Sequence, residues 1–257
     1  MRLSSATIIS NTEIRPGLRL LELHSPHLAQ AARPGQYCMV RCCDPLASDP
    51  LLRRPFFIHA TQPPRQECSL LVAARGRGSS WLAAQPARAA LDILGPLGHG
   101  WEVPPHARNL LLIGDGAFIP SLTLLAQTAI EQELAVTLLC RFASDADIYP
   151  PALLSPEIEY QVITPDSSAR PLEELVGGYL AWADAVYCSV SLETAQTLYQ
   201  RYERLRQKHI AQCLLTRPFA CAAGVCLTCA IDTHTGTHTG SKLVCRDGPV
   251  FALGEIV

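Results

Sequence analysis

The stretch NLLLIGDG, residues 109–116, is an apolar run that ends in two glycines around one aspartate. An uninterrupted run of this kind is typical of a strand buried on both faces of a sheet. The residues that follow it, SLTLLAQTAIEQE (121–133), have the pattern of a helix. A buried strand that leads directly into a helix predicts the start of a parallel α/β unit.

The buried-strand pattern returns three times further along the chain, at 135–141, 159–164 and 184–190. Helical stretches lie between and after these segments, and the clearest covers 191–209. One face of that helix carries Leu192, Ala195, Leu198, Tyr199, Tyr202 and Leu205. Alternating strands and helices predict a mostly parallel α/β domain, which we assign to residues 105–215.

Short β segments precede the central stretch. They are apolar or β-branched, bounded by Pro and Gly, and lie at 18–25, 36–42, 55–60, 68–74 and 90–95. Several short strands at this spacing predict a small antiparallel barrel. The stretch WEVPPHARN (101–109), with two prolines, separates the barrel from the α/β domain. We therefore assign the barrel to residues 1–104.

Composition excludes several classes of protein. The chain has 257 residues, 48% of them hydrophobic and 17% charged, with a net charge of -2. This balance argues against binding to nucleic acid or to an anionic membrane surface, because both need a dense Lys/Arg surface. No run approaches the roughly 20 apolar residues of a membrane span, and the N-terminus lacks the apolar core of a signal peptide. We expect a cytoplasmic protein.

Cysteines are the most informative residue type. There are eleven, so a fully paired disulfide framework is impossible. Cys221, Cys226 and Cys229 follow the spacing C-x4-C-x2-C, and Cys245 comes after fifteen intervening residues. This is the plant-type [2Fe-2S] spacing. The small residues at 222–224 suit a loop whose amides turn inward toward cluster sulfur atoms.

Two other interpretations of these cysteines remain. Cys226 and Cys229 with His234 and His238 resemble a zinc site, although the central spacer is much shorter than in a zinc finger. The cysteines could also be plain thiols. The repeat THTGTHTG (233–240) is typical of a lengthened hairpin tip. The seven other cysteines are interpreted as small buried hydrophobic residues: Cys38, Cys42, Cys43, Cys68, Cys140, Cys188 and Cys213.

Two motifs in the barrel segment are suited to a phosphate-bearing cofactor. Residues 53–58, RRPFFI, lie on a predicted strand, where an arginine can pair with a phosphate. Residues 75–80, RGRGSS, lie at the start of a predicted helix. Glycines followed by hydroxyls at the start of a helix suit a pyrophosphate. The competing interpretation of the second motif is an ordinary turn with an N-cap.

Taken in order, these motifs resemble a known family. The order is R-P-x-x-I, G-x-G-S, LDILGPLGHG (91–100), the apolar strand ending in glycines, C-x4-C-x2-C and KLVCRDGPVF (242–251). It resembles the electron-transfer subunit of the two-subunit, NAD-linked dihydroorotate dehydrogenases, which belongs to the ferredoxin reductase-like flavoproteins. The resemblance covers nearly the whole chain.

The resemblance implies FAD on the barrel, an NAD-binding-like α/β domain behind it, and a [2Fe-2S] segment at 216–257 near the docking face for a catalytic subunit. It implies a hetero-oligomer that serves pyrimidine biosynthesis. The residues implied to bind FAD are Arg54, Pro55, Phe56, Phe57, Val72, Ala73, Gly78 and Ser79. The cluster ligands carried over are Cys221, Cys226, Cys229 and Cys245. No side chain is assigned as a catalytic acid, base or nucleophile, because the cofactors carry the chemistry.

The sequence departs from the family at three places. Phe57 stands where the family has Ser or Thr near the reactive flavin nitrogen, and it cannot donate a hydrogen bond. The glycine-rich turn reads GDGAFIP (114–120), in which Asp115 and Phe118 oppose a nucleotide pyrophosphate. The turn that faces the nicotinamide reads CSV at 188–190. These departures predict that NAD(P) binding is weakened or lost. The competing interpretation is that the turn tolerates the substitutions and NAD(P) still binds.

Two functional hypotheses follow. The first is an oxidoreductase subunit, not a stand-alone catalyst, that relays electrons between FAD, a [2Fe-2S] cluster and a partner dehydrogenase. The second is a non-catalytic, metal-stabilised assembly or regulatory module on a reductase-like scaffold. Arg54-Pro55 together with the G-x-G-S motif favours the first hypothesis, whereas Phe57 and the altered glycine turn favour the second.

Overall fold

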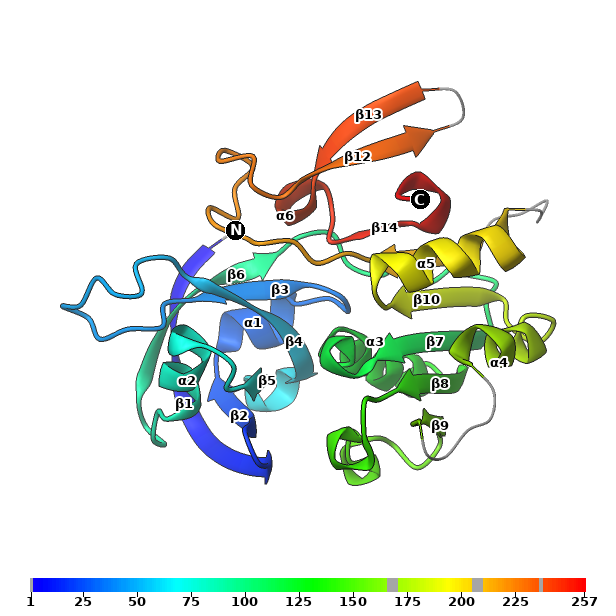
Figure 1. The fold of residues 1–257 in the computed structure, drawn as a ribbon. Coiled ribbons are helices and arrows are strands. Elements are labelled where there is room, and N and C mark those ends of the chain that lie inside the picture. Colours follow the sequence, from blue (N-terminus) through cyan, green and yellow to red (C-terminus); the bar gives the residue numbers. More distant parts are fainter. Residues whose placement is uncertain (1, 166–170, 205–209, 236–237) are drawn as a thin grey trace.

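A computed structural model of the chain describes residues 2–165, 171–204, 210–235 and 238–257. A barrel and a sheet flanked by helices lie side by side, and a C-terminal hairpin lies across the top of both (Figure 1). Among the described residues, no helix is long and apolar enough to cross a membrane.

The N-terminal part is a closed antiparallel barrel, which confirms the fold predicted for it. Its strands follow the order β1-β2-β5-β4-β3-β6. Side chains alternate between buried and exposed along β6, as expected for a strand with one face in a barrel core. The strands are β1 (Arg2–Arg15), β2 (Leu18–His24), β3 (Tyr37–Val40), β4 (Arg54–Gln62), β5 (Glu67–Ala73) and β6 (Ala90–Leu97), with helices α1 (Pro26–Ala31) and α2 (Arg77–Ala83).

Strand β1 has no counterpart among the predicted segments, although it is the longest strand in the barrel. Its sequence is mostly polar, and only Ala6 and Ile8 are buried. The strand is held by its backbone, since it pairs with β2 on one side and β6 on the other. A strand stabilised mainly by its neighbours has a weak hydrophobic pattern.

The second part is a six-stranded sheet in the order β14-β11-β10-β7-β8-β9. Neighbouring strands are parallel except for the β11–β14 pair. The mostly parallel sheet predicted from the apolar runs is thus confirmed. Its elements are β7 (Asn109–Asp115), α3 (Pro120–Glu131), β8 (Ala135–Arg141), β9 (Glu159–Ile163), α4 (Leu172–Tyr179), β10 (Ala185–Ser189), α5 (Leu192–Leu198), β11 (Ala211–Leu214) and β14 (Val250–Ala252).

The helix predicted for 191–209 is shorter than expected. Helix α5 ends at Leu198 and continues as a π-helical turn, Tyr199–Glu203. Ala195 and Leu198 are buried in the core, and Tyr199 and Tyr202 pack against it, so the predicted apolar face is confirmed for these residues. The last part of the predicted helix, residues 205–209, lies outside the described residues.

The C-terminal segment forms a hairpin and then returns to the sheet. Strands β12 (Ala230–Thr235) and β13 (His238–Leu243) pair with Thr235 opposite His238, which confirms a hairpin at the Thr-His repeat. Helix α6 (Val244–Asp247) follows, and β14 adds an antiparallel edge strand to the sheet. Residues 236–237 and the side chains of 234–238 lie outside the described part.

The division of the chain into domains at residues 1–104, 105–215 and 216–257 remains a prediction.

Buried hydrogen bonds join the barrel to the rest of the molecule. The Tyr37 hydroxyl donates to the Cys245 carbonyl at 2.9 Å. The His59 Nε2 atom lies 2.6 Å from the Tyr149 hydroxyl, and the Thr123 hydroxyl donates to the His59 carbonyl at 2.7 Å. These contacts set the position of the cysteine segment and of α3 relative to the barrel.

Candidate functional site

The four cysteines of the spacing motif come together at the edge of the barrel. Cys221, Cys226 and Cys229 lie on the loop before β12, and Cys245 lies in α6. The Cys221 Sγ atom accepts the backbone N–H of Cys226 at 3.5 Å, and the Cys229 Sγ atom accepts that of Cys245 at 3.4 Å. The thiols therefore form two adjacent pairs. A [2Fe-2S] cluster is held by four cysteines, two on each iron, so this arrangement fits such a cluster.

The loop directs backbone amides toward Cys221. The Cys221 Sγ atom accepts N–H groups from Ala223 and Val225 at 3.4 Å and from Cys226 at 3.5 Å. Ala222 and Gly224 make this possible with φ angles of 54° and 76°, in the left-handed region. The Ala223 amide, followed by that of Cys226, lowers the pKa of Cys221 to about 6. A thiolate at neutral pH is the form that binds metal.

Cys229 and Cys245 differ from Cys221 in their burial. Both are buried, and the Cys245 amide donates to the Cys229 Sγ atom at 3.4 Å. Burial, together with the neighbouring Cys229, raises the pKa of Cys245 to about 12. A buried thiolate pair requires a compensating cation, and iron would supply that charge.

The zinc interpretation requires His234 and His238 as ligands. The side chains of His234 and His238 lie outside the described part of the chain. Among the side chains that are described, no three His, Cys, Asp or Glu are placed to hold one metal ion. The seven remaining cysteines are buried and free, which confirms their interpretation as small hydrophobic residues.

The two motifs predicted to meet FAD are adjacent in the structure. A Cβ atom added to Gly78 would lie 3.0 Å from the Cγ atom of Arg54. Glycine at this position therefore lets the start of α2 approach β4. The Arg54 guanidinium donates to the Leu52 carbonyl at 2.7 Å and forms no ion pair with an acid among the described residues. An arginine beside a glycine-rich helix start is a donor set that fits a pyrophosphate.

The remaining residues predicted to bind FAD lie on β4, β5 and α2. Ser79 is occupied by its own turn, because its hydroxyl accepts the amides of Arg75 and Gly76 at 3.0 Å. Val72 is fully buried in the barrel core, whereas Ala73 is half-buried and packs toward the sheet. The other three, Pro55, Phe56 and Phe57, are half-buried on β4.

Aromatic side chains connect β4 to the cysteine segment. Phe57 pairs with Tyr37 across β3 and β4, with ring centroids 6.3 Å apart in an edge-on arrangement. Tyr37 in turn packs against Phe219, two residues before Cys221, at 4.8 Å. Burial raises the pKa of Tyr37 further above its usual range, so its hydroxyl stays protonated and donates to Cys245. Tyr37 therefore links the predicted flavin strand with both arms of the cysteine segment.

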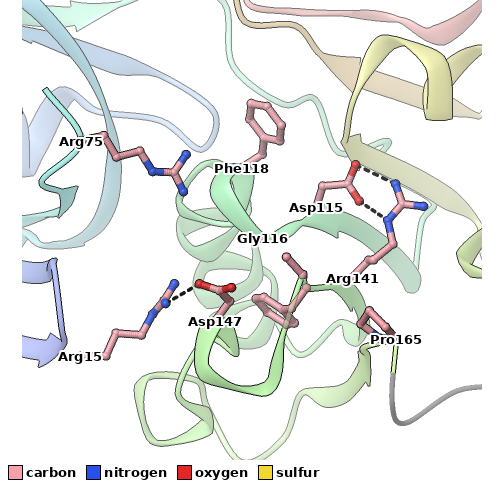
Figure 2. Close-up of a pocket in the computed structure, with 10 residues that line it drawn as sticks. Arg15, Arg75, Asp115, Gly116, Phe118, Arg141, Asp147 and Pro165 are labelled. Atoms are coloured by element: carbon pink, nitrogen blue, oxygen red, sulfur yellow. Dashed lines mark hydrogen bonds and ion pairs between the residues drawn. The ribbon is translucent and has the colours of Figure 1, made fainter.

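A cavity opens at the carboxyl ends of β7 and β8. This cavity of about 480 Å³ is bounded by Arg75, Asp115, Phe118 and Arg141 among others (Figure 2). Asp115 and Arg141 form an ion pair at 2.9 Å. The altered glycine turn predicted to face a nucleotide thus forms one wall of a charged cavity.

Several residues of this site have no signal in the sequence. Tyr37, Phe219 and Arg141 each belong to an ordinary apolar or strand segment. Only the pairing of distant strands and loops brings them to the site. Tyr37, for example, is 208 positions from Cys245.

Comparison with known proteins gives consistent matches. Residues 217–257 match the family described as the iron-sulfur cluster binding domain of dihydroorotate dehydrogenase B. The protein named dihydroorotate dehydrogenase B (NAD(+)), electron transfer subunit, from Shouchella clausii is 30% identical over 98% of this chain and 96% of its own length. Its namesake from Geobacillus thermodenitrificans is 28% identical over 98% and 97%.

Solved structures share the fold. The NADH-dependent reduced ferredoxin-NADP oxidoreductase aligns with a TM-score of 0.78 at 19% identity, covering 98% of this chain and 89% of that one. Phthalate dioxygenase reductase, described as a modular structure for electron transfer from pyridine nucleotides to [2Fe-2S], aligns with a TM-score of 0.67 at 14% identity, covering 95% and 94%. The chain therefore has a ferredoxin reductase-like fold.

Proposed function

The chain belongs to the electron transfer subunits of dihydroorotate dehydrogenase B, and from this premise we propose that it relays electrons between FAD, a [2Fe-2S] cluster and a catalytic dehydrogenase subunit. The observation that carries the proposal is the meeting of the four cysteines beside the barrel, where Cys226 contacts Cys221 and Cys245 contacts Cys229 through backbone amides. Family membership does not favour the alternative of a non-catalytic assembly module.

Cys221, Cys226, Cys229 and Cys245 are the proposed cluster ligands. The cluster supplies one-electron chemistry when bound. The chain's part is to hold the thiols in two pairs, to direct three amides at Cys221, and to keep water from the buried Cys229 and Cys245. Amides that point at sulfur and burial of the ligands both tune the potential of such a centre.

Arg54 and Gly78 are the proposed anchors of the FAD pyrophosphate. Ser79 stabilises the turn before Gly78, because its hydroxyl accepts the Arg75 amide. Phe57 lies on the strand that faces the flavin in the family. The FAD supplies two-electron chemistry when bound, and the protein positions it and tunes it. The adjacency of Arg54 and Gly78 supports this assignment, which extends to Pro55, Phe56, Val72 and Ala73.

The cluster loop is the proposed contact for the catalytic subunit. Val225 and Leu227 lie on either side of the exposed Cys226 and are themselves 79% and 62% exposed. Exposed apolar side chains of this kind are typical of an interaction site. We place the protein in the cytoplasm, because an odd number of cysteines excludes a fully paired disulfide framework and a reducing compartment keeps thiols available for a cluster.

Cofactor analysis of the purified full-length chain tests the proposal. We expect a yellow-brown protein with FAD and about two irons per chain. The dithionite-reduced protein should give the electron paramagnetic resonance signal of a [2Fe-2S] cluster. A red-brown protein without flavin, or a colourless zinc protein, would support the assembly-module alternative instead.

Substitution in the cluster loop tests the partner contact. Val225→Glu places a charge on the exposed loop, so we expect at least tenfold weaker association with the co-purifying catalytic subunit and an unchanged cluster spectrum. Ile9→Glu is the matched control. Ile9 is 42% exposed and lies on β1 beyond the Thr7–Ala90 pair, at the end of the barrel away from Cys245. Equal effects of both variants would contradict the assignment.

A further inference from the structure

The carboxyl end of β7 lies at a topological switch point. From β7 the chain adds β8 and β9 on one side of the sheet, and then returns to place β10 on the other side of β7. In open parallel sheets, ligands bind in the crevice that this reversal leaves outside the carboxyl ends of the strands. Asp115 is the last residue of β7, and Ser191 comes two residues after β10.

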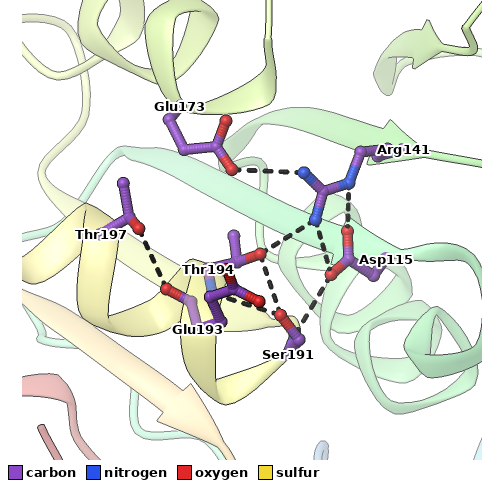
Figure 3. Close-up of polar contacts among 7 residues, drawn as sticks. All are labelled: Asp115, Arg141, Glu173, Ser191, Glu193, Thr194 and Thr197. Atoms are coloured by element: carbon purple, nitrogen blue, oxygen red, sulfur yellow. Dashed lines mark hydrogen bonds and ion pairs between the residues drawn. The ribbon is translucent and has the colours of Figure 1, made fainter.

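The Asp115 carboxylate bridges this crevice (Figure 3). One carboxylate oxygen accepts the Arg141 Nε–H at 2.9 Å. The other accepts the Arg141 Nη2–H at 3.1 Å and the Ser191 amide at 3.1 Å. A bidentate arginine contact and a backbone amide are the donors that a phosphate uses in such crevices. The Asp115 carboxylate therefore makes the contacts that a bound phosphate would make, although it belongs to the protein itself.

Arg141 has little capacity left for a second anion. Its Nη1 atom donates to Glu173 at 3.2 Å, and its Nη2 atom also donates to the Thr194 hydroxyl at 2.9 Å. One guanidinium thus faces two carboxylates, so the group of Asp115, Arg141 and Glu173 carries a net negative charge. That charge repels an incoming phosphate.

The opposite wall of the cavity carries a second ion pair, and Arg75 also lines the cavity. Arg15 is bound to Asp147 at 2.8 Å, and both residues line the cavity (Figure 2). Phe118 lies on the cavity wall as well. Two of the arginines that line the cavity, Arg15 and Arg141, are thus bound to carboxylates that line it too. An incoming nucleotide would have to break these ion pairs before it could use either arginine.

We infer that Asp115 is a specificity-determining residue that occupies the phosphate position of the crevice and excludes pyridine nucleotides. The inference rests on the proposed electron-relay function, because it concerns the nucleotide site of that same subunit. It distinguishes this chain from curated relatives whose names include NAD(+). It also gives a physical cause for the weakened NAD(P) binding expected from the sequence.

Calorimetric titration of the holoprotein with ADP-ribose and with NAD⁺ tests the inference without relying on turnover. The wild type should bind neither ligand with a Kd below about 1 mM, which corresponds to about 4 kcal/mol of binding free energy. Asp115→Gly empties the crevice and frees Arg141 and the Ser191 amide, so its affinity for both ligands should rise at least tenfold. Asp115→Asn keeps the shape and removes the charge, and its affinity should rise by a smaller factor.

Glu173→Gln is the matched control. It removes a carboxylate from the same arginine but leaves Asp115 across the crevice, so any gain in its affinity should be much smaller than that of Asp115→Gly. Micromolar binding by the wild type, an equal gain in Glu173→Gln, or no gain in either Asp115 variant would overturn the inference. Flavin and cluster spectra of the same wild-type sample test the proposed function separately. A sample without flavin or cluster absorbance would contradict that function, whatever the result of the titration.

Discussion

Replacing Tyr37 by Phe removes one hydroxyl from the junction between the barrel and the cysteine segment. The ring stays, and with it the contact with Phe219 at 4.8 Å. What is lost is the buried hydrogen bond to the Cys245 carbonyl at 2.9 Å. A buried neutral hydrogen bond contributes about 1 kcal/mol to stability. For a chain of this size, that corresponds to a fall of about 2–4 °C in the thermal unfolding midpoint.

The same substitution should loosen the proposed cluster ligand Cys245. If release of iron requires local opening of α6, then about 1 kcal/mol lowers the cost of opening and speeds release about fivefold. The assay follows the loss of cluster absorbance after a ferrous chelator is added to the oxidised or reduced holoprotein. The unfolding midpoint is measured on the same preparation.

Tyr187→Phe is the matched control for this prediction. The Tyr187 hydroxyl donates to the Glu102 carbonyl at 3.1 Å, and the side chain is as buried as that of Tyr37. It lies on β10, and its ring meets Trp101 edge-on at 5.6 Å. Both variants should lose similar thermal stability, but only Tyr37→Phe should lose iron faster. Equal rates of iron loss in the two variants would refute the positioning role of Tyr37.

Two further predictions concern other parts of the structure. Burial lowers the pKa of His59 from 6.5 to about 4, so between these values the unfolded chain binds a proton that the folded chain does not. The free energy of unfolding should therefore fall by about 2 kcal/mol between pH 7.5 and 5.0 in a denaturation series. His59→Gln should remove this part of the pH dependence. An unchanged pH dependence in that variant would contradict the assignment to His59. Gly78→Ala places a methyl group against Arg54 and should weaken FAD retention about tenfold on gel filtration, whereas Gly76→Ala, whose Cβ meets nothing within 4 Å, should retain FAD. Equal retention by both variants would argue against a pyrophosphate site at this turn.

Local patterns account for what the sequence predicts well. Strand β7 and helix α3 follow directly from an apolar run and a helical period, and the barrel strands β2 to β6 from Pro- and Gly-bounded segments. The cysteine spacing is equally local over 221–229, because one tight loop carries three of the thiols. The assignment of the four cysteines to a cluster remains a prediction of that spacing.

Long-range pairing accounts for what the sequence does not predict. Strand β1 is stabilised by two neighbours and not by its own hydrophobic pattern. Asp115 is visible in the sequence as an oddity in a glycine turn. Its partner Arg141 is the last residue of a neighbouring strand, 26 positions away. No local pattern indicates that this arginine turns toward the carboxylate, so the closed crevice becomes apparent only in the structure.

The most direct test of the central claim is anaerobic mixing of the reduced holoprotein with the oxidised catalytic subunit that co-purifies with it. Cluster and flavin absorbance are followed by stopped flow, with electron paramagnetic resonance of samples frozen during the reaction. We predict that the cluster signal disappears as the catalytic subunit becomes reduced, and that Val225→Glu slows this transfer. A cluster that stays reduced in the presence of the oxidised subunit would contradict the proposed relay.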